Sequence, residues 1–143
     1  MLDLFAGSGS LGIEALSLGA GWVDFVEWDR RQCQVIRTNL QTTGLLASGE
    51  VHCADVGRLL DRLTQRYHLV LMDPPYAIEE LGPVLEKLGE EDGPIEEWGM
   101  LVVGHSRFLE LLPEYSALRR VSQRRYGDNA VDFYKKIGPD DED

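Results

Sequence analysis

The sequence predicts an α/β protein with a single, mostly parallel sheet that ends in a C-terminal antiparallel hairpin. Two observations carry this prediction. Short apolar runs alternate with amphipathic stretches as far as about residue 106, a pattern typical of β-α-β units covered on both faces. Residues 117–137 break this order with two alternating runs around "YGDNA", the pattern of a hairpin at a sheet edge.

The first half of the chain supplies two strands and two helices. "MLDLF" at residues 1–5 indicates a strand, and an apolar stripe over residues 11–18 predicts a helix. "WVDFVE" at residues 22–27 alternates like a second strand. Asp29 is expected to cap a helix that runs to about residue 40.

Three further strands are predicted after the loop at Gly44. "EVHCADV" at residues 50–56 indicates a strand followed by a helix cap, and residues 57–66 a helix. "HLVLMDPPY" at residues 68–76 is typical of a buried strand that stops at two prolines. A helix from about residue 78 to 89 follows, and then the strand "GMLVVGHS".

Length and composition indicate one intracellular domain. A chain of 143 residues can close a single hydrophobic core, which we expect over residues 1–137, with an acidic, disordered tail over residues 138–143. Two cysteines suggest neither a disulfide framework nor a zinc cluster. No apolar run approaches the roughly 20 residues that span a bilayer, and the start is not a signal peptide. We therefore expect a cytoplasmic protein that binds no metal and no membrane.

A glycine-rich turn, Gly7, Gly9 and Gly12, follows the first predicted strand as G-x-G-x-x-G. Such glycines allow a tight turn, the approach of a ligand to the backbone, and close packing of the helix on the sheet. A purely structural turn would also explain them. Glu27 ends the second strand, where a carboxylate can accept hydrogen bonds from ribose hydroxyls. These features suit NAD and S-adenosylmethionine equally.

Two more carboxylates favour S-adenosylmethionine. Asp3 lies just before the turn, where it can face an ammonium group but would repel a phosphate. Asp55 follows the third strand, where it could accept from an adenine amine. Capping of the next helix explains Asp55 equally well, and one residue can do both.

The "DPPY" motif, Asp73, Pro74, Pro75 and Tyr76, ends the fourth strand and predicts the chemistry. Ligands of open α/β sheets bind outside the carboxyl ends of the strands. If Asp73 and the Pro74 carbonyl each accept one hydrogen of a nucleobase amine, its nitrogen lone pair is freed for methylation. Tyr76 would stack on the base, which must be unstacked to enter. Asp-Pro also opens turns, so a strand-ending turn is the competing interpretation.

Taken together, the motifs resemble those of class I S-adenosylmethionine-dependent methyltransferases, and most closely the RsmD-type family. They are "LDLFAGSGSLGIEALSLGA", "VEWDR", "ADV", "LVLMDPPY" and "RRYGDNAVDFYKK". The resemblance implies a Rossmann-like fold with a methyltransferase domain over residues 1–137. It also implies methyl transfer from S-adenosylmethionine to guanine N2 of ribosomal RNA, within a small ribosomal subunit or a precursor particle.

The resemblance also implies the roles of individual residues. Asp3, Gly7 and Gly9 would hold the methionine part of the cofactor, with Phe5 also in its site. Glu27 would bind the ribose, Trp28 would flank the adenine, and Asp55 with Val56 would contact the adenine edge. Asp73, Pro74, Pro75 and Tyr76 would form the catalytic pocket.

The N-terminus of the chain differs from the pattern of the RsmD-type family. Members of the family resemble one another in a segment before the first strand that helps to wall the cofactor pocket and carries basic residues. Here Met1 lies inside that strand. We expect the longer form to be the working enzyme, and this chain to fold but to bind the cofactor weakly.

The charge balance conflicts with a nucleic-acid substrate. The chain has 25 acidic against 14 basic residues, whereas RNA-binding domains usually have a basic balance. Six bases nevertheless gather in the predicted hairpin and are candidates for RNA contact: Arg119, Arg120, Arg124, Arg125, Lys135 and Lys136. A solvated edge strand whose charges discourage pairing explains them equally well.

Other functions remain open from the sequence alone. A DNA or protein-glutamine amino methyltransferase could use the same "DPPY" motif, although such enzymes usually add a recognition domain. An NAD-dependent oxidoreductase would explain the glycines and Glu27 but neither Asp3 nor "DPPY". A truncated, non-catalytic cofactor-binding module is a third possibility. The three histidines show no metal-ligand spacing and are interpreted as structural.

Overall fold

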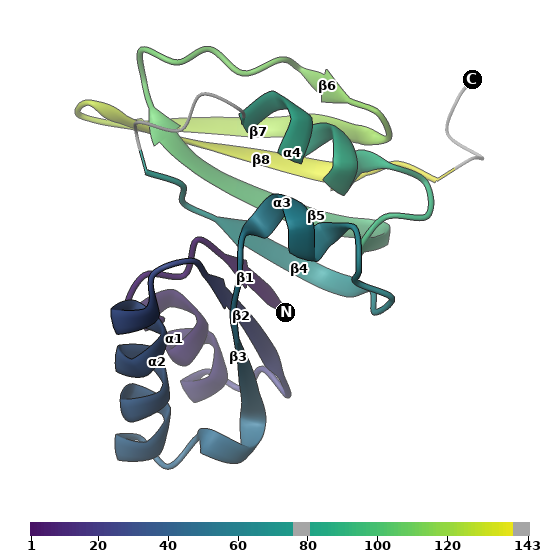
Figure 1. The fold of residues 1–143 in the computed structure, drawn as a ribbon. Helices are drawn as coiled ribbons and strands as arrows, with labels where there is room; N and C mark the ends of the chain where they lie inside the picture. The colour runs from purple at the N-terminus through teal and green to yellow at the C-terminus, as the bar shows by residue number, and fades with distance from the viewer. Residues whose placement is uncertain (76–80, 139–143) are drawn as a thin grey trace.

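The computed structural model describes residues 1–75 and 81–138, which form one eight-stranded sheet in the order β3-β2-β1-β4-β5-β8-β7-β6 (Figure 1). The strands are β1 (Leu2–Leu4), β2 (Val23–Glu27), β3 (Gly49–Cys53), β4 (Tyr67–Met72), β5 (Ile95–Ser106), β6 (Glu114–Tyr115), β7 (Leu118–Tyr126) and β8 (Asn129–Lys136). β1 to β5 pair in parallel, and β8, β7 and β6 add antiparallel pairs. The predicted fold class is confirmed; the short β6 was not predicted.

Helices lie on both faces of the sheet. They are α1 (Ser10–Ser17), α2 (Arg30–Thr42), the short 3₁₀ helix η1 (Leu46–Ser48), α3 (Val56–Leu60) and α4 (Leu81–Gly89). Phe25 packs in one cluster with residues of α1 and α2, whereas its neighbour Val26 packs in the other cluster with residues of α3 and α4. Consecutive strand residues point to opposite faces, so the two helix pairs cover opposite sides. Figure 1 shows α1 and α2 beside β1 to β3.

The structure confirms the predicted cap of α2, but α3 ends earlier than predicted. Asp29 caps α2, with its Oδ1 accepting from the Arg31 N–H at 2.8 Å. The helix predicted over residues 57–66 ends at Leu60. The predicted end is wrong because Leu63 packs against the core from the turn that follows the helix, and its apolar spacing is therefore the same as that of a longer helix. In the described part of the chain, no helix is long and apolar enough to cross a membrane.

β5 begins earlier than its predicted start at residue 99. Ile95 of β5 pairs with Tyr67 of β4, and Met100 of β5 pairs with Leu69 of β4. The β5 residues between Ile95 and Met100 therefore bulge out of the ladder. Trp98 lies in this bulge with a φ of 69°, a conformation that non-glycine residues rarely adopt. A bulge has no alternating pattern, which is why the sequence did not indicate strand there.

Candidate active site

The glycine-rich turn joins β1 to α1 at the carboxyl edge of the parallel strands. Gly7 and Gly9 have φ values of 58° and 78°, which favour glycine. A Cβ at Gly7 would meet no atom within 4 Å, so the space over the turn is open to a ligand. A Cβ at Gly12 would collide with the Phe25 ring. The turn therefore packs closely on its inner side and presents bare backbone on its outer side.

Asp3 is the buried carboxylate of the site, with 3% of its surface exposed. Its Oδ2 accepts a hydrogen bond from the Gly12 N–H at 3.2 Å. Burial raises the pKa of Asp3 to about 7; the Gly12 hydrogen bond opposes this rise, and the charges of Asp73 and Glu27 add to it. The carboxylates of Asp73 and Glu27 therefore lie close enough to Asp3 for their charges to act on it.

Glu27 ties the glycine turn to the start of α2. Its Oε1 accepts from the Gly7 N–H at 2.9 Å, and its Oε2 accepts from the Asp29 N–H at 2.8 Å. The carboxylate is thereby held at the end of β2, facing the turn. Trp28 follows it with 74% of its surface exposed. The Glu27 carboxylate and the exposed Trp28 indole lie next to each other, so one ligand with a ribose and a flat ring could contact both.

Asp55 is the N-cap of α3. Its Oδ2 accepts from the Arg58 N–H at 3.1 Å, as the capping interpretation predicted. Within residues 1–75 and 81–138, no hydrogen bond to its Oδ1 is found, so that oxygen is available as an acceptor. Val56 beside it is buried, with 4% exposed. The contact with adenine stays a prediction.

Asp73 follows β4 and is exposed, whereas Pro74 is buried and Pro75 is exposed. Tyr76 lies outside the described residues. Gly104 on the neighbouring β5 makes room for the carboxylate: a Cβ at Gly104 would lie 2.8 Å from Asp73 Oδ1. Gly104 was not recognised in the sequence, because its importance depends on the register of β4 and β5.

A cavity of about 390 Å³ opens beside Asp73. It is bounded by Leu11 at the start of α1, by Leu71 and Val102 on the sheet, and by Val131 on β8. Its lining is mainly apolar, with the Asp73 carboxylate among the polar groups. A flat, largely apolar ring that carries an amine suits such a space.

His105, interpreted from the sequence as structural, also lines this cavity. Its ring is buried between two oxygen atoms, with Nε2 at 2.8 Å from Asp132 Oδ1 and Nδ1 at 2.8 Å from the Ser106 carbonyl. Asp132, fully buried on β8, also accepts from Arg120 at 3.1 Å and from Gln123 at 2.7 Å. This network holds β5, β8 and β7 together below the cavity.

The six predicted RNA-contact bases do not form one surface. Arg124 and Arg125 are exposed near the tip of the β7–β8 hairpin, which turns at Gly127 with a φ of 60°. Lys136 is buried at the other end of β8, and its Nζ donates to the carbonyls of Glu91 and Ile95 at 2.9 and 2.7 Å.

The remaining three bases already have partners. Arg119 pairs with Glu114 at 3.5 Å. Arg120 binds the buried Asp132, and Lys135 lies 5.3 Å from the centre of the Trp98 ring. Arg124 and Arg125 are therefore the members best placed to contact a polyanion.

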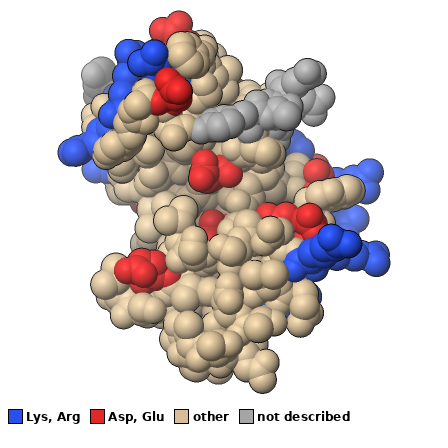
Figure 2. Space-filling model, turned by 90° about the vertical axis from the view of Figure 1, so that its left-hand side faces the viewer, with Lys and Arg blue, Asp and Glu red and all other residues tan. Residues whose placement is uncertain are grey.

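Figure 2 looks onto the edge that carries the carboxyl ends of the parallel strands. Lys and Arg atoms gather at the upper left and at the right of this face, and Asp and Glu atoms lie between them. The upper half belongs to the β5–β8 part of the sheet, as comparison with Figure 1 shows. Basic groups thus flank an acidic centre.

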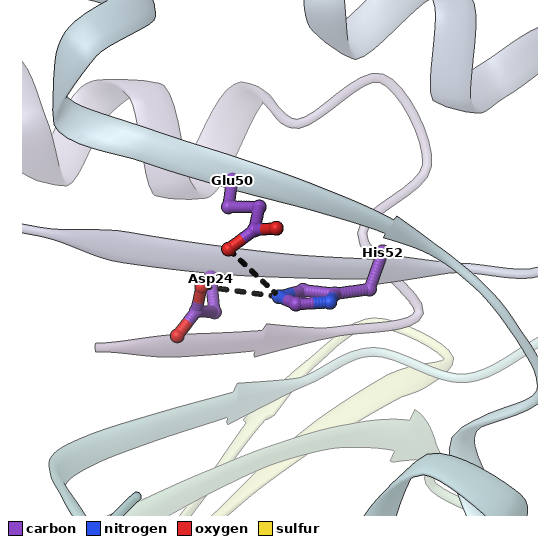
Figure 3. Close-up of side chains that lie close together, drawn as sticks. All are labelled: Asp24, Glu50 and His52. Carbon is purple, nitrogen blue, oxygen red and sulfur yellow. Dashed lines mark hydrogen bonds and ion pairs between the residues drawn. The ribbon is translucent and has the colours of Figure 1, made fainter.

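A second group of titratable side chains lies on β2 and β3. His52 Nε2 is 3.1 Å from Asp24 Oδ1 and 3.9 Å from Glu50 Oε2 (Figure 3). Tyr67 donates to Asp24 Oδ2 at 2.5 Å, and both burial and the Asp24 charge raise the pKa of Tyr67. Among the described residues, Asp24, Glu50 and His52 lie close enough together to hold a metal ion, and the contacts of His52 with the two carboxylates also account for this cluster without one.

The protein family described as Conserved hypothetical protein 95 matches residues 1–135. Over 140 residues the chain is 37% identical to the protein named "Putative rRNA methyltransferase YlbH" of Bacillus subtilis (strain 168), covering 96% of this chain and 76% of that protein. Over 94 residues it is 36% identical to ribosomal RNA small subunit methyltransferase D of Escherichia coli (strain K12), covering 62% of this chain and 46% of the relative. The chain thus spans less than half of the second relative.

Solved structures resemble the fold over nearly the whole chain. A conserved hypothetical protein of Streptococcus pyogenes has a TM-score of 0.88 at 34% identity, covering 96% of this chain and 85% of the other. The methyltransferase yhhF of Escherichia coli, described as putative, has a TM-score of 0.87 at 26% identity, covering 96% and 76%.

Proposed function

The chain belongs to the family described as Conserved hypothetical protein 95, an RsmD-type methyltransferase family, and from this premise we propose that it methylates ribosomal RNA with S-adenosylmethionine. The family assignment confirms the resemblance that the sequence motifs indicated. We take residues 1–137 as the methyltransferase domain. The proposed target is the exocyclic N2 amine of a guanine in small-subunit RNA.

One observation carries the choice of cofactor. Glu27 accepts from the Gly7 N–H and Asp3 accepts from the Gly12 N–H, so two carboxylates lie against the glycine turn, and the charges of Asp73 and Glu27 both raise the pKa of Asp3. A dinucleotide would bring its pyrophosphate to this turn and meet repulsion. S-adenosylmethionine brings an ammonium group and ribose hydroxyls, which a carboxylate attracts and binds. This supports S-adenosylmethionine over NAD.

The groups along this edge match the parts of the cofactor. Asp3 would attract the ammonium group, and the open space over the backbone of Gly7 leaves room for the methionine part, for which Gly9 is the other proposed contact in the turn. The other proposed contacts are those of Phe5, of Glu27 with the ribose, and of Trp28, Asp55 and Val56 with the adenine. When bound, the cofactor supplies a methyl group made electrophilic by its sulfonium.

Asp73 and Pro74 are proposed to prepare the amine. Its nitrogen is a poor nucleophile because the lone pair is delocalised into the ring. Hydrogen bonds from its two hydrogens to the Asp73 carboxylate and the Pro74 carbonyl would draw the lone pair out of conjugation and orient it. Pro75 keeps the strand end extended, and Tyr76 is proposed to stack on the base. The cavity beside Asp73 offers space for a base that has left its stack.

The RNA is proposed to approach along the tip of the β7–β8 hairpin, where Arg124 and Arg125 are exposed. Arg124 and Arg125 can bind phosphates there despite the net charge of −11, because screening limits the reach of distant acidic groups. A small ribosomal subunit or a precursor particle is the proposed form of the substrate, since the relative in Escherichia coli is named for the small subunit.

Methyl transfer to small ribosomal subunits tests the function. The chain and, in parallel, a form extended at its N-terminus are incubated with methyl-labelled S-adenosylmethionine and with subunits from an Escherichia coli strain that lacks methyltransferase D. Subunits from the parent strain, in which the site is expected to be already methylated, are the control. We expect label in the first sample only, recovered as N2-methylguanosine after digestion. Label in another nucleoside would refute the guanine N2 assignment, and no label with either form of the protein would refute the function.

A further inference from the structure

We propose that a pocket between the β5–β6 loop and the β7–β8 hairpin binds an RNA nucleotide that flanks the methylated one. This flanking-nucleotide pocket has a volume of about 260 Å³ and is lined mainly by Arg107, Phe108, Gln123 and Arg125. The proposal rests on the proposed function and adds a second point of RNA recognition to it. None of Arg107, Phe108 and Gln123 was singled out in the sequence.

Phe108 is an aromatic side chain held out into solvent. It is 75% exposed, and the Arg107 guanidinium carbon lies 4.7 Å from the centre of its ring. The cation holds the ring by a cation–π contact while most of the ring remains accessible. Exposed aromatic rings beside arginines are the usual platforms for unpaired RNA bases, which stack on them without regard to sequence.

The charges around Phe108 suit a phosphate. Arg125 is exposed, and within the described ranges no ion pair involves it. Arg107 makes only a loose pair with Asp128, at 3.8 Å. Glu110 at the rim is the opposing carboxylate. The guanidinium groups of Arg107 and Arg125 can therefore bind a phosphate, and the ring of Phe108 can stack on a base. A nucleotide carries both groups.

The position of the pocket fits a nucleotide next to the target. Arg107 directly follows β5, and its N–H donates to the Asp128 carbonyl at 2.9 Å. Gly104, which lies against Asp73, is three residues earlier, so its Cα is at most about 11 Å from that of Arg107. A base placed against Asp73 therefore leaves its neighbour in the chain within reach of the pocket.

The floor of the pocket is rigid and connects to the candidate active site. Gln123 and Arg120 both bind the buried Asp132 from the pocket side. Asp132 in turn holds His105, which lines the cavity beside Asp73. A nucleotide bound here would therefore rest on side chains that also support the wall of the cavity.

Substitutions of Phe108 test the proposal. Phe108→Ala removes the stacking ring, Phe108→Trp keeps one, and Leu112→Ala is the matched control, because Leu112 is a 57% exposed side chain of the same loop that does not line the pocket. Binding of a fluorescein-labelled, single-stranded twelve-nucleotide RNA is measured by anisotropy. The KM for small ribosomal subunits and the Kd for S-adenosylmethionine are measured in parallel.

We expect Phe108→Ala to raise the Kd for RNA about 10-fold, which is the range for loss of one stacked base. It should raise the KM for subunits while leaving kcat and cofactor affinity unchanged. Phe108→Trp should restore RNA binding, and Leu112→Ala should match the wild type. Equal RNA binding by Phe108→Ala and wild type would overturn the pocket. Absence of methyl transfer by the wild type would instead overturn the proposed function, and the RNA-binding measurement would still decide on the pocket.

Discussion

The Asp73 carboxylate lies against the bare Cα of Gly104, where a Cβ would come 2.8 Å from Asp73 Oδ1. The Asp73 side chain, which follows β4, can therefore occupy its position because Gly104 of β5 has no side chain. Gly104→Ala should displace the carboxylate and lower kcat for methyl transfer at least about 10-fold, since an error of about 1 Å in a reacting group can cost 100-fold. The melting temperature should stay close to that of the wild type.

Gly21→Ala is the matched control for this substitution. A Cβ at Gly21 would meet no atom within 4 Å, so its kcat should be unchanged. If Gly104→Ala also kept wild-type kcat, the placement of Asp73 by Gly104 would have no part in catalysis.

The pKa of Asp3 predicts a pH-dependent stability. Folding raises this pKa from its ordinary value of 3.8 to about 7, so between pH 4 and 7 the folded state keeps a proton that the unfolded state has lost. The stabilisation is fully present below pH 4, falls as the pH rises from 4 to 7, is lost above pH 7, and amounts to at most roughly 4 kcal/mol. Asp3→Asn, which retains the acceptor for the Gly12 N–H, should abolish this part of the dependence.

Urea unfolding at pH 5 and pH 8 measures the Asp3 effect. The difference in unfolding free energy between the two pH values should be smaller in Asp3→Asn than in the wild type. Glu14→Gln, which neutralises an exposed carboxylate on α1, should behave like the wild type. Identical pH dependence in Asp3→Asn and wild type would show that Asp3 is ionised throughout this range.

Glu27 gives a prediction for cofactor affinity. Glu27→Gln keeps one acceptor toward the turn but loses the charge, so the Kd for S-adenosylmethionine should rise about 10- to 100-fold. Asp29→Asn is the control, because asparagine caps a helix as well as aspartate does. Calorimetry measures both variants. Equal affinities of Glu27→Gln and wild type would remove Glu27 from the cofactor site.

The hairpin tip gives a prediction for RNA binding. Arg124→Glu with Arg125→Glu should weaken RNA binding and reduce its salt dependence, because two phosphate contacts are lost. Arg37→Glu with Arg62→Glu makes the same change in net charge at exposed positions outside the hairpin and is the control. If both pairs weakened binding equally, only the overall charge of the chain would matter.

Much of the fold was predictable because its signals are local. The strand β2, the cap at Asp29 and the hairpin around Gly127 each depend on neighbouring residues, and the structure confirms all three, although β2 is buried on both faces instead of alternating between buried and exposed residues. The end of α3 and the bulge at Trp98 depend on tertiary packing that overrides local preference. For that reason the sequence predicts too long a helix at α3 and does not predict the bulge at Trp98.

The candidate site was predictable where its residues follow strands directly. The charges of Glu27 and Asp73 both raise the pKa of Asp3, as expected from the common edge of parallel strands. The contribution of Gly104 requires the β4–β5 register, and the burial of Lys136 requires the loop before β5. No sequence spacing encodes either relationship.

Calorimetric titration of the chain with S-adenosylmethionine and, separately, with NAD tests the central claim most directly. The carboxylates around the glycine turn predict binding of S-adenosylmethionine and no heat of binding with NAD. Binding of NAD in its place, or of neither ligand, would contradict the account.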